Sequence, residues 1–156
     1  PLGCQLKASK CLVNRGRFIA QVFAGLMEWK KGNTFGTVAF TSYGFFWLTL
    51  VGIVSLPKTG LMAPAGEGSM VAFLIMWGIF TAILFVGTLK LTRALQFIFG
   101  SLTLLFILLG LGDATGNETI KHLAGWEGII CGASAMYAAA AQILNEIYGR
   151  EVLPLG

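Results

Sequence analysis

Long apolar runs constrain the fold of this chain more than any other feature, and the run from Phe35 to Leu56 is the clearest of them. About 20 apolar residues in a helix cross the roughly 30 Å hydrocarbon core of a bilayer. Similar runs occupy 70–89, 94–112 and 123–144, while the run at 18–29 reaches only part of the way. The sequence therefore predicts an all-α integral membrane protein, a helical bundle with four full spans and one partial span.

The composition also favours a membrane protein, since hydrophobic residues make up 56% of the 156 residues and charged residues only 12%. Soluble domains carry about 25% charged residues. We expect one transmembrane helical domain over 18–156, preceded by a basic segment at 1–17 that does not read as a signal peptide. The sequence has no stripe of basic residues interleaved with aromatic residues, so we do not expect it to bind nucleic acid. Membrane lipids are the expected partners of the Lys and Arg side chains.

The short loops predict an orientation. Lys and Arg are concentrated at 30–34 and 88–93, whereas the opposite loops mix Lys with acidic residues. The positive-inside rule counts Lys and Arg near the ends of the spans. We therefore expect these two loops and the C-terminus to face the cytoplasm, in an inner or plasma membrane.

The residues that catalysis or metal binding would need are missing from the pattern. The chain has one His and three Cys, with no C-x-x-C pair. No nucleophile with a nearby His and Asp, no phosphate-binding loop and no H-E-x-x-H motif is present. We expect no enzymatic activity, no metal site and no cofactor.

A small polar cluster, Thr41 to Tyr43, interrupts the first long run. Polar groups at that depth are unfavourable unless they are hydrogen-bonded or face a wet cavity. Ser and Thr can bond back to their own helix, which would make the cluster an ordinary membrane core. The alternative is a stripe that lines a pore, and the residues alone leave both interpretations open.

The fifth run carries Glu127, the one acid inside a full-length apolar run. Its place soon after His122 and beside Trp126 favours the membrane interface, and a local proton site is the alternative. His122 itself suits a capping or interfacial role, or a group that titrates near neutral pH. Gly128 and Gly132 form a GxxxG pattern that predicts close helix packing.

Four stretches of the chain resemble one transporter family, in the same order. The stretch KKGNTFGTVAFTSYGFFW at 30–47 is similar to the signature loop and following helix of the acetate uptake (succinate–acetate permease) transporters. Further stretches are similar at 87–97 (GTLKLTRALQF), 122–137 (HLAGWEGIICGASAMY) and 144–156 (LNEIYGREVLPLG). The resemblance covers about 19–156.

The resemblance implies six helices around a pore in each protomer, and protomers assembled as hexamers. It implies a channel or transporter for acetate and similar small monocarboxylates, with succinate a further substrate and protons as co-transported partners. Tyr43 and Leu102 match two walls of the family's pore constriction. Ala135 matches a pore-lining position that influences substrate size, and Gln21 and Thr41 are weaker candidates along the substrate path.

The front of the chain departs from the family pattern. The family opens with an NPAPLG motif and a first helix that supplies a constriction Phe, whereas this chain begins Pro1-Leu2-Gly3 and joins the pattern near Ile19. Phe18 is not assigned to that missing role. We expect this chain as written to transport acetate poorly or not at all, and the alternative function is a truncated, non-transporting membrane protein of the same family.

Overall fold

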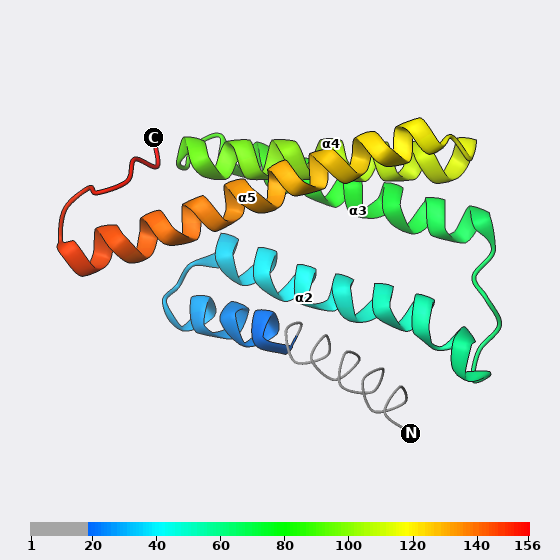
Figure 1. Cartoon of the computed structure of the whole chain (residues 1–156). Coiled ribbons are helices and arrows are strands. Elements are labelled where there is room, and N and C mark those ends of the chain that lie inside the picture. The colour runs from blue at the N-terminus through cyan, green and yellow to red at the C-terminus, as the bar shows by residue number, and fades with distance from the viewer. Residues whose placement is uncertain (1–18) are drawn as a thin grey trace, which may run out of the picture. The chain divides into compact units, whose positions relative to one another are not determined.

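The computed structural model describes residues 19–156, and the chain divides into two compact units, 1–65 and 66–156. The basic segment at 1–17 and Phe18 lie outside the described residues. All regular structure in the described part is helical, as predicted (Figure 1). Its elements are a helix at 19–30, α2 (Thr34–Ser55), a short 3-10 helix η1 (Pro57–Thr59), α3 (Glu67–Thr88), α4 (Arg93–Thr115) and α5 (Glu118–Tyr148).

The first unit is built on a helical hairpin in which the helix at 19–30 and α2 run antiparallel, side by side (Figure 1). The chain reverses at the predicted Gly32-Asn33 turn, where Gly32 has a φ of 72° and Asn33 is the N-cap of α2. Gly25 marks the close approach of the two helices, because a Cβ there would overlap Thr41 Oγ1 and lie 2.9 Å from Thr41 N. At this position the backbone of Gly25 packs directly against Thr41, with no room for a methyl group on Gly25.

In the second unit α4 is the central helix and packs against both α3 and α5 (Figure 1). Phe99 and Phe106 of α4 and Leu74 and Leu84 of α3 are buried in its core. The Cβ of Phe106 lies 3.2 Å from where a Cβ on Gly78 would stand. Large side chains of one helix thus fill positions opened by small residues of the next, as packing in lipid requires.

Two fully buried threonines of α3 satisfy their hydroxyl groups within the helix. Thr81 Oγ1 donates to Trp77 O at 2.7 Å, and Thr88 Oγ1 donates to Phe85 O at 2.6 Å. Both residues are 0% exposed. Bonding of this kind lets a polar residue lie inside an apolar bundle without the penalty of an unpaired donor.

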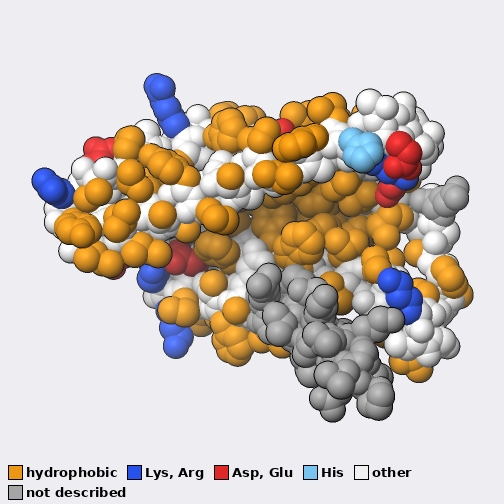
Figure 2. Space-filling model, viewed as in Figure 1, with side chains coloured by type: hydrophobic (Ala, Val, Ile, Leu, Met, Phe, Trp, Pro, Cys, Tyr) orange, Lys and Arg blue, Asp and Glu red, His pale blue; other side chains and the backbone are white. Residues whose placement is uncertain are grey.

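Among residues 19–156, four helices have the length and apolarity that a membrane crossing requires, which confirms the predicted four spans. Large apolar side chains cover much of the face drawn in Figure 2. Met136 is 74% exposed and Ile147 is 73% exposed, although both are apolar. Exposed apolar surface of this extent suits contact with lipid or with other chains.

The last helix, α5, extends beyond the apolar run that predicted it. The fifth run was expected at 123–144, but α5 has 31 residues and runs from Glu118 to Tyr148. Asn117 caps its start by accepting a hydrogen bond from Thr119 N, and Gly149 ends it in the left-handed conformation. Apolarity detects the part of a helix that crosses lipid, whereas capping residues decide where the helix ends.

Candidate functional site

The polar cluster of α2 lies in the middle of that helix. Tyr43 is buried, with 8% of its surface exposed, while Thr41 and Ser42 are half-buried. Ala39 and Phe46, four residues before and three after Tyr43, are also buried. These spacings fall on one side of a helix, so Tyr43 belongs to the inner face of α2.

Gln21 and Thr41, the weaker pathway candidates, belong to the same helical hairpin. Thr41 faces Gly25, and Gln21 is one helical turn before Gly25 in the helix at 19–30. Gln21 is half-buried, like Thr41. The structure thus brings both predicted residues to the hairpin that also carries Tyr43.

Leu102 and Ala135 lie in the second unit, on α4 and α5. Leu102 is half-buried and directly follows the buried Ser101, and Ala135 is exposed. Tyr43 belongs to the first unit and Leu102 to the second. Their meeting in one constriction therefore stays a prediction.

A pocket of about 350 Å³ opens at the start of α4. One of the residues that line it, Ser134, directly precedes Ala135 in the sequence. Its walls come from α4, from α5 and from the segment that follows α5; they comprise Arg93, Ala94, Phe97, Ser134, Tyr137, Pro154, Leu155 and Gly156. The C-terminal segment is fixed there by hydrogen bonds. Tyr137 Oη donates to Pro154 O at 2.9 Å, and Ala94 N donates to Leu155 O at 2.9 Å.

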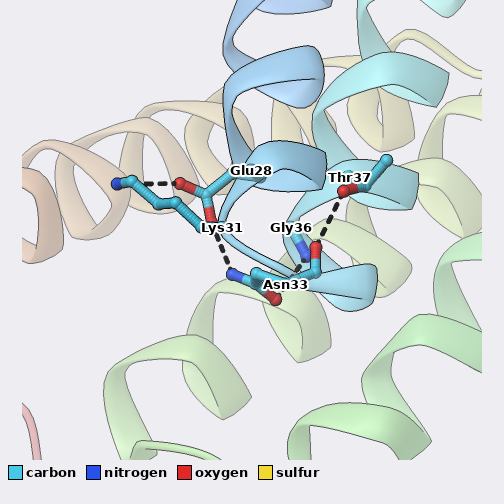
Figure 3. Close-up of polar contacts among 5 residues, drawn as sticks. All are labelled: Glu28, Lys31, Asn33, Gly36 and Thr37. Atoms are coloured by element: carbon cyan, nitrogen blue, oxygen red, sulfur yellow. Dashed lines mark hydrogen bonds and ion pairs between the residues drawn. The ribbon is translucent and has the colours of Figure 1, made fainter.

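Glu28 is a polar residue that the sequence analysis did not single out. Its carboxylate accepts hydrogen bonds from Asn33 Nδ2 at 2.5 Å and from Lys31 Nζ at 3.4 Å (Figure 3). Asn33 in turn accepts from Gly36 N at 3.0 Å, and Thr37 Oγ1 donates to Asn33 O at 2.8 Å. The signal was an acid at the end of an apolar run, just before a turn, where a carboxylate can accept hydrogen bonds from the side chains of the turn.

Glu127 is half-buried and accepts a hydrogen bond from Ser101 Oγ at 2.6 Å. The bond joins α5 to α4. Cys131, one turn after Glu127, directs its Sγ toward Ile98 O of α4 at 3.8 Å. The sequence alone favoured the membrane interface for Glu127 and indicated no partner for it. Two residues 26 positions apart form no recognisable motif.

The remaining candidate for chemistry, His122, is exposed in the second turn of α5. Across residues 19–156 no group of three His, Cys, Asp or Glu side chains lies close enough to hold a metal ion. Within the membrane-spanning helices the structure brings together the hydroxyl of Ser101 and the carboxyl group of Glu127.

Comparison with known proteins gives consistent matches over most of the chain. The model of the GPR1/FUN34/yaaH family matches residues 11–149. The succinate-acetate/proton symporter SatP of Escherichia coli (strain K12) is 58% identical over 138 residues, covering 88% of this chain and 73% of the relative. Acetate permease A of Emericella nidulans is 35% identical over 88% of this chain, which spans about half (51%) of that relative.

A solved structure, that of the bacterial acetate channel SatP, resembles this one with a TM-score of 0.86. The two chains are 58% identical, and the match covers 88% of this chain and 76% of the other. Sequence and structure thus agree on the same relatives.

Proposed function

Because this chain belongs to the GPR1/FUN34/yaaH family, we propose that it carries acetate and similar small carboxylate anions, together with protons, across a membrane. One observation carries the proposal: the match to the bacterial acetate channel SatP, at 58% identity and a TM-score of 0.86 over 88% of the chain. The names of the relatives support it, since they include a succinate-acetate/proton symporter and an acetate permease. Transport also requires membrane-spanning helices, and the described residues contain four candidates.

The proposed pathway has an apolar constriction formed by Tyr43 and Leu102. Tyr43 is buried on the inner face of α2, and Leu102 is half-buried in the middle of α4. A narrow apolar ring excludes charged solutes by removing their water rather than by size alone. Thr41, Gln21 and Ala135 are proposed to lie along the path, where hydroxyl, amide and small side chains leave room and partners for a carboxylate.

The proposed assembly is a closed ring of identical protomers, six by family resemblance. Gly125 and Gly132 of α5 have open space where a Cβ would stand, and Ala135 and Ala139 are exposed beside them. Small exposed residues on a membrane helix permit another helix to approach closely. Most homo-oligomers close by cyclic symmetry.

The proposed orientation has the loops at 30–34 and 88–93 and the C-terminus in the cytoplasm. Within the second unit the C-terminal segment is bonded to the start of α4, since Arg93 N donates to Gly156 O at 3.2 Å. The C-terminal segment and the basic turn at 88–93 therefore lie at the same end of that unit. The positive charge of this turn supports the cytoplasmic side.

The test is uptake of labelled acetate and lactate by vesicles that contain the protein or its Leu102→Ala variant. Contrary to the weak transport expected from the front of the sequence alone, the wild type is expected to take up acetate, because it matches the acetate channel over 88% of the chain. The variant is expected to admit the larger lactate as well. Leu104→Ala is the matched control, because Leu104 is on the same helix but 47% exposed. No acetate uptake by the inserted wild type contradicts the function, and identical substrate selectivity in wild type and Leu102→Ala contradicts the constriction.

A further inference from the structure

Ser101 and Glu127 lie far from the ends of their helices. Ser101 is eight residues into α4, and Glu127 is nine residues into α5. At 1.5 Å per residue these positions are about 12 Å and about 13 Å from the polar starts of the two helices. A layer of roughly 30 Å that covers the apolar parts of both helices encloses the pair.

The hydroxyl–carboxyl contact is the link between α4 and α5 at this depth, with Ser101 Oγ 2.6 Å from Glu127 Oε1. Ser101 is 9% exposed, whereas Glu127 is half-buried. On α5 the nearest other titratable group is Cys131, and α4 presents the hydroxyl of Ser101 rather than a charge. The ion pairs found among residues 19–156 do not include Glu127.

A serine hydroxyl can partner a carboxyl group in both of its charge states. It donates to a carboxylate, and it accepts from the O–H of a carboxylic acid. The pair therefore keeps a hydrogen bond when a proton arrives or leaves. In a medium of low polarity, the charged and neutral forms of a carboxyl group differ strongly in solvation free energy. Gain or loss of one proton therefore changes the electric field at the contact between α4 and α5.

The contact is directly connected to the proposed constriction. Leu102 follows Ser101 in the chain, so the α4 turn that holds Ser101 also holds Leu102. Gly128, next to Glu127, packs against Leu105, with Leu105 methyl carbons 3.7 Å from where its Cβ would stand. A change at Glu127 therefore acts on a packed stretch of α4, one residue from Leu102.

We propose that Glu127 is a proton-exchange site inside the α4–α5 contact, with Ser101 as its hydrogen-bond partner, and that its protonation makes passage of the carboxylate depend on pH. The Glu127 carboxylate takes one proton from water on one side and later releases it to water on the other. The dependence of transport on this site rests on the proposed function, whereas proton binding does not.

The site itself is tested by infrared titration of the reconstituted full chain. The carbonyl band of a protonated carboxyl group that appears on acidification is expected to lose one component in Glu127→Gln. Glu118→Gln is the control: Glu118 is an exposed acid in the first turn of the same helix, so this variant should lose the component of a solvated carboxyl group and keep the component assigned to Glu127. An unchanged band in Glu127→Gln overturns the site, whether or not the protein transports anything.

The coupling is tested by acetate uptake at acidic and neutral outside pH. The proton occupancy of a single group changes by up to about tenfold per pH unit. The acid-to-neutral ratio of uptake should therefore fall in Glu127→Gln by up to about tenfold for each pH unit between the two conditions. The same ratio in wild type and Glu127→Gln, both active, overturns the coupling. If Glu127→Gln does not insert, Ser101→Ala replaces it: its carboxyl band should shift in frequency, and an unshifted band overturns the pairing.

Discussion

Asn145 and Leu153 exchange two hydrogen bonds: Asn145 Nδ2 donates to Leu153 O at 2.8 Å, and Leu153 N donates to Asn145 Oδ1 at 3.0 Å. Val152 N donates to the same Oδ1 at 2.7 Å. One side chain in the last turn of α5 thus fixes the segment that follows the helix. That segment then supplies backbone acceptors to the start of α4, where first-turn N–H groups lack partners within their own helix.

Replacing Asn145 by Ala should loosen the C-terminal segment. Three hydrogen bonds are lost, of which two are part-buried and one is exposed. The two part-buried bonds are worth about 1 kcal/mol each, so we expect a loss of about 2 kcal/mol in unfolding free energy. Asn145→Asp keeps the two bonds that Oδ1 accepts and should lose less. Unfolding in detergent, with protease cleavage of 150–156 as a second readout, measures both. Gln142→Ala, on an exposed position of α5, is the control, and an equal effect of the two Ala variants would refute the role of Asn145.

Gly25→Ala should push apart the two helices of the hairpin in the first unit. The new methyl group would overlap Thr41 Oγ1 and stand 2.9 Å from Thr41 N, so the helices must move apart. Overpacking of this kind typically costs about 1–3 kcal/mol of stability. Adding Thr41→Ala should rescue only part of the loss, because the backbone nitrogen remains. Thermal unfolding distinguishes this from Gly125→Ala, whose Cβ meets nothing within 4 Å and which should be neutral in the monomer.

Asn33→Ala should weaken the turn between the helix at 19–30 and α2. The substitution removes the side-chain cap on Gly36 N and one partner of the Glu28 carboxylate. Loss of an N-cap costs about 1 kcal/mol. Asn33→Ser keeps the cap and should recover most of the stability, whereas Asn33→Asp keeps the cap but sets two carboxylates together. Denaturant unfolding should rank Ser above Asp; the opposite order would show that the contact with Glu28 is unimportant.

Gly132→Leu should break the proposed ring of protomers. Gly132 faces open space in the single chain, so a larger side chain there disturbs a neighbouring protomer rather than the fold. Native mass spectrometry in mild detergent is expected to show a wild-type oligomer and a smaller species for the variant. Ala72→Leu makes a comparable change at an exposed position of α3 and should leave the assembly intact. A wild type that is monomeric at micromolar concentration contradicts the proposal.

The spans could be predicted from the sequence because membrane crossing is a property of single segments. The run from Phe35 to Leu56 has the length of a span whatever it packs against, and α2 was found there. Local capping chemistry was harder to read, since Asn117 and Gly149 extend α5 well beyond its apolar part. A turn signal such as Gly32-Asn33 was readable because φ above zero favours Gly locally.

The site was less predictable, because it depends on contacts between distant residues. Ser101 and Glu127 are each ordinary on their own helix, and only the packing of α4 against α5 pairs them. Tyr43 was singled out as polar in an apolar run, but its burial with Ala39 and Phe46 could not be told from the opposite face by apolarity alone. Apolar residues occupy every side of α2, so the sequence pattern does not show which face of the helix is buried.

The buried threonines of α3 bear on where water can run through this protein. Thr81 and Thr88 direct their hydroxyl groups to carbonyls of their own helix, and no buried side-chain nitrogen or oxygen in the described chain lacks a partner. A file of water molecules needs unmet donors and acceptors along its way. The seam between α3 and α4 leaves no buried side-chain nitrogen or oxygen without a partner, so we expect it to stay dry and water to follow other helix faces.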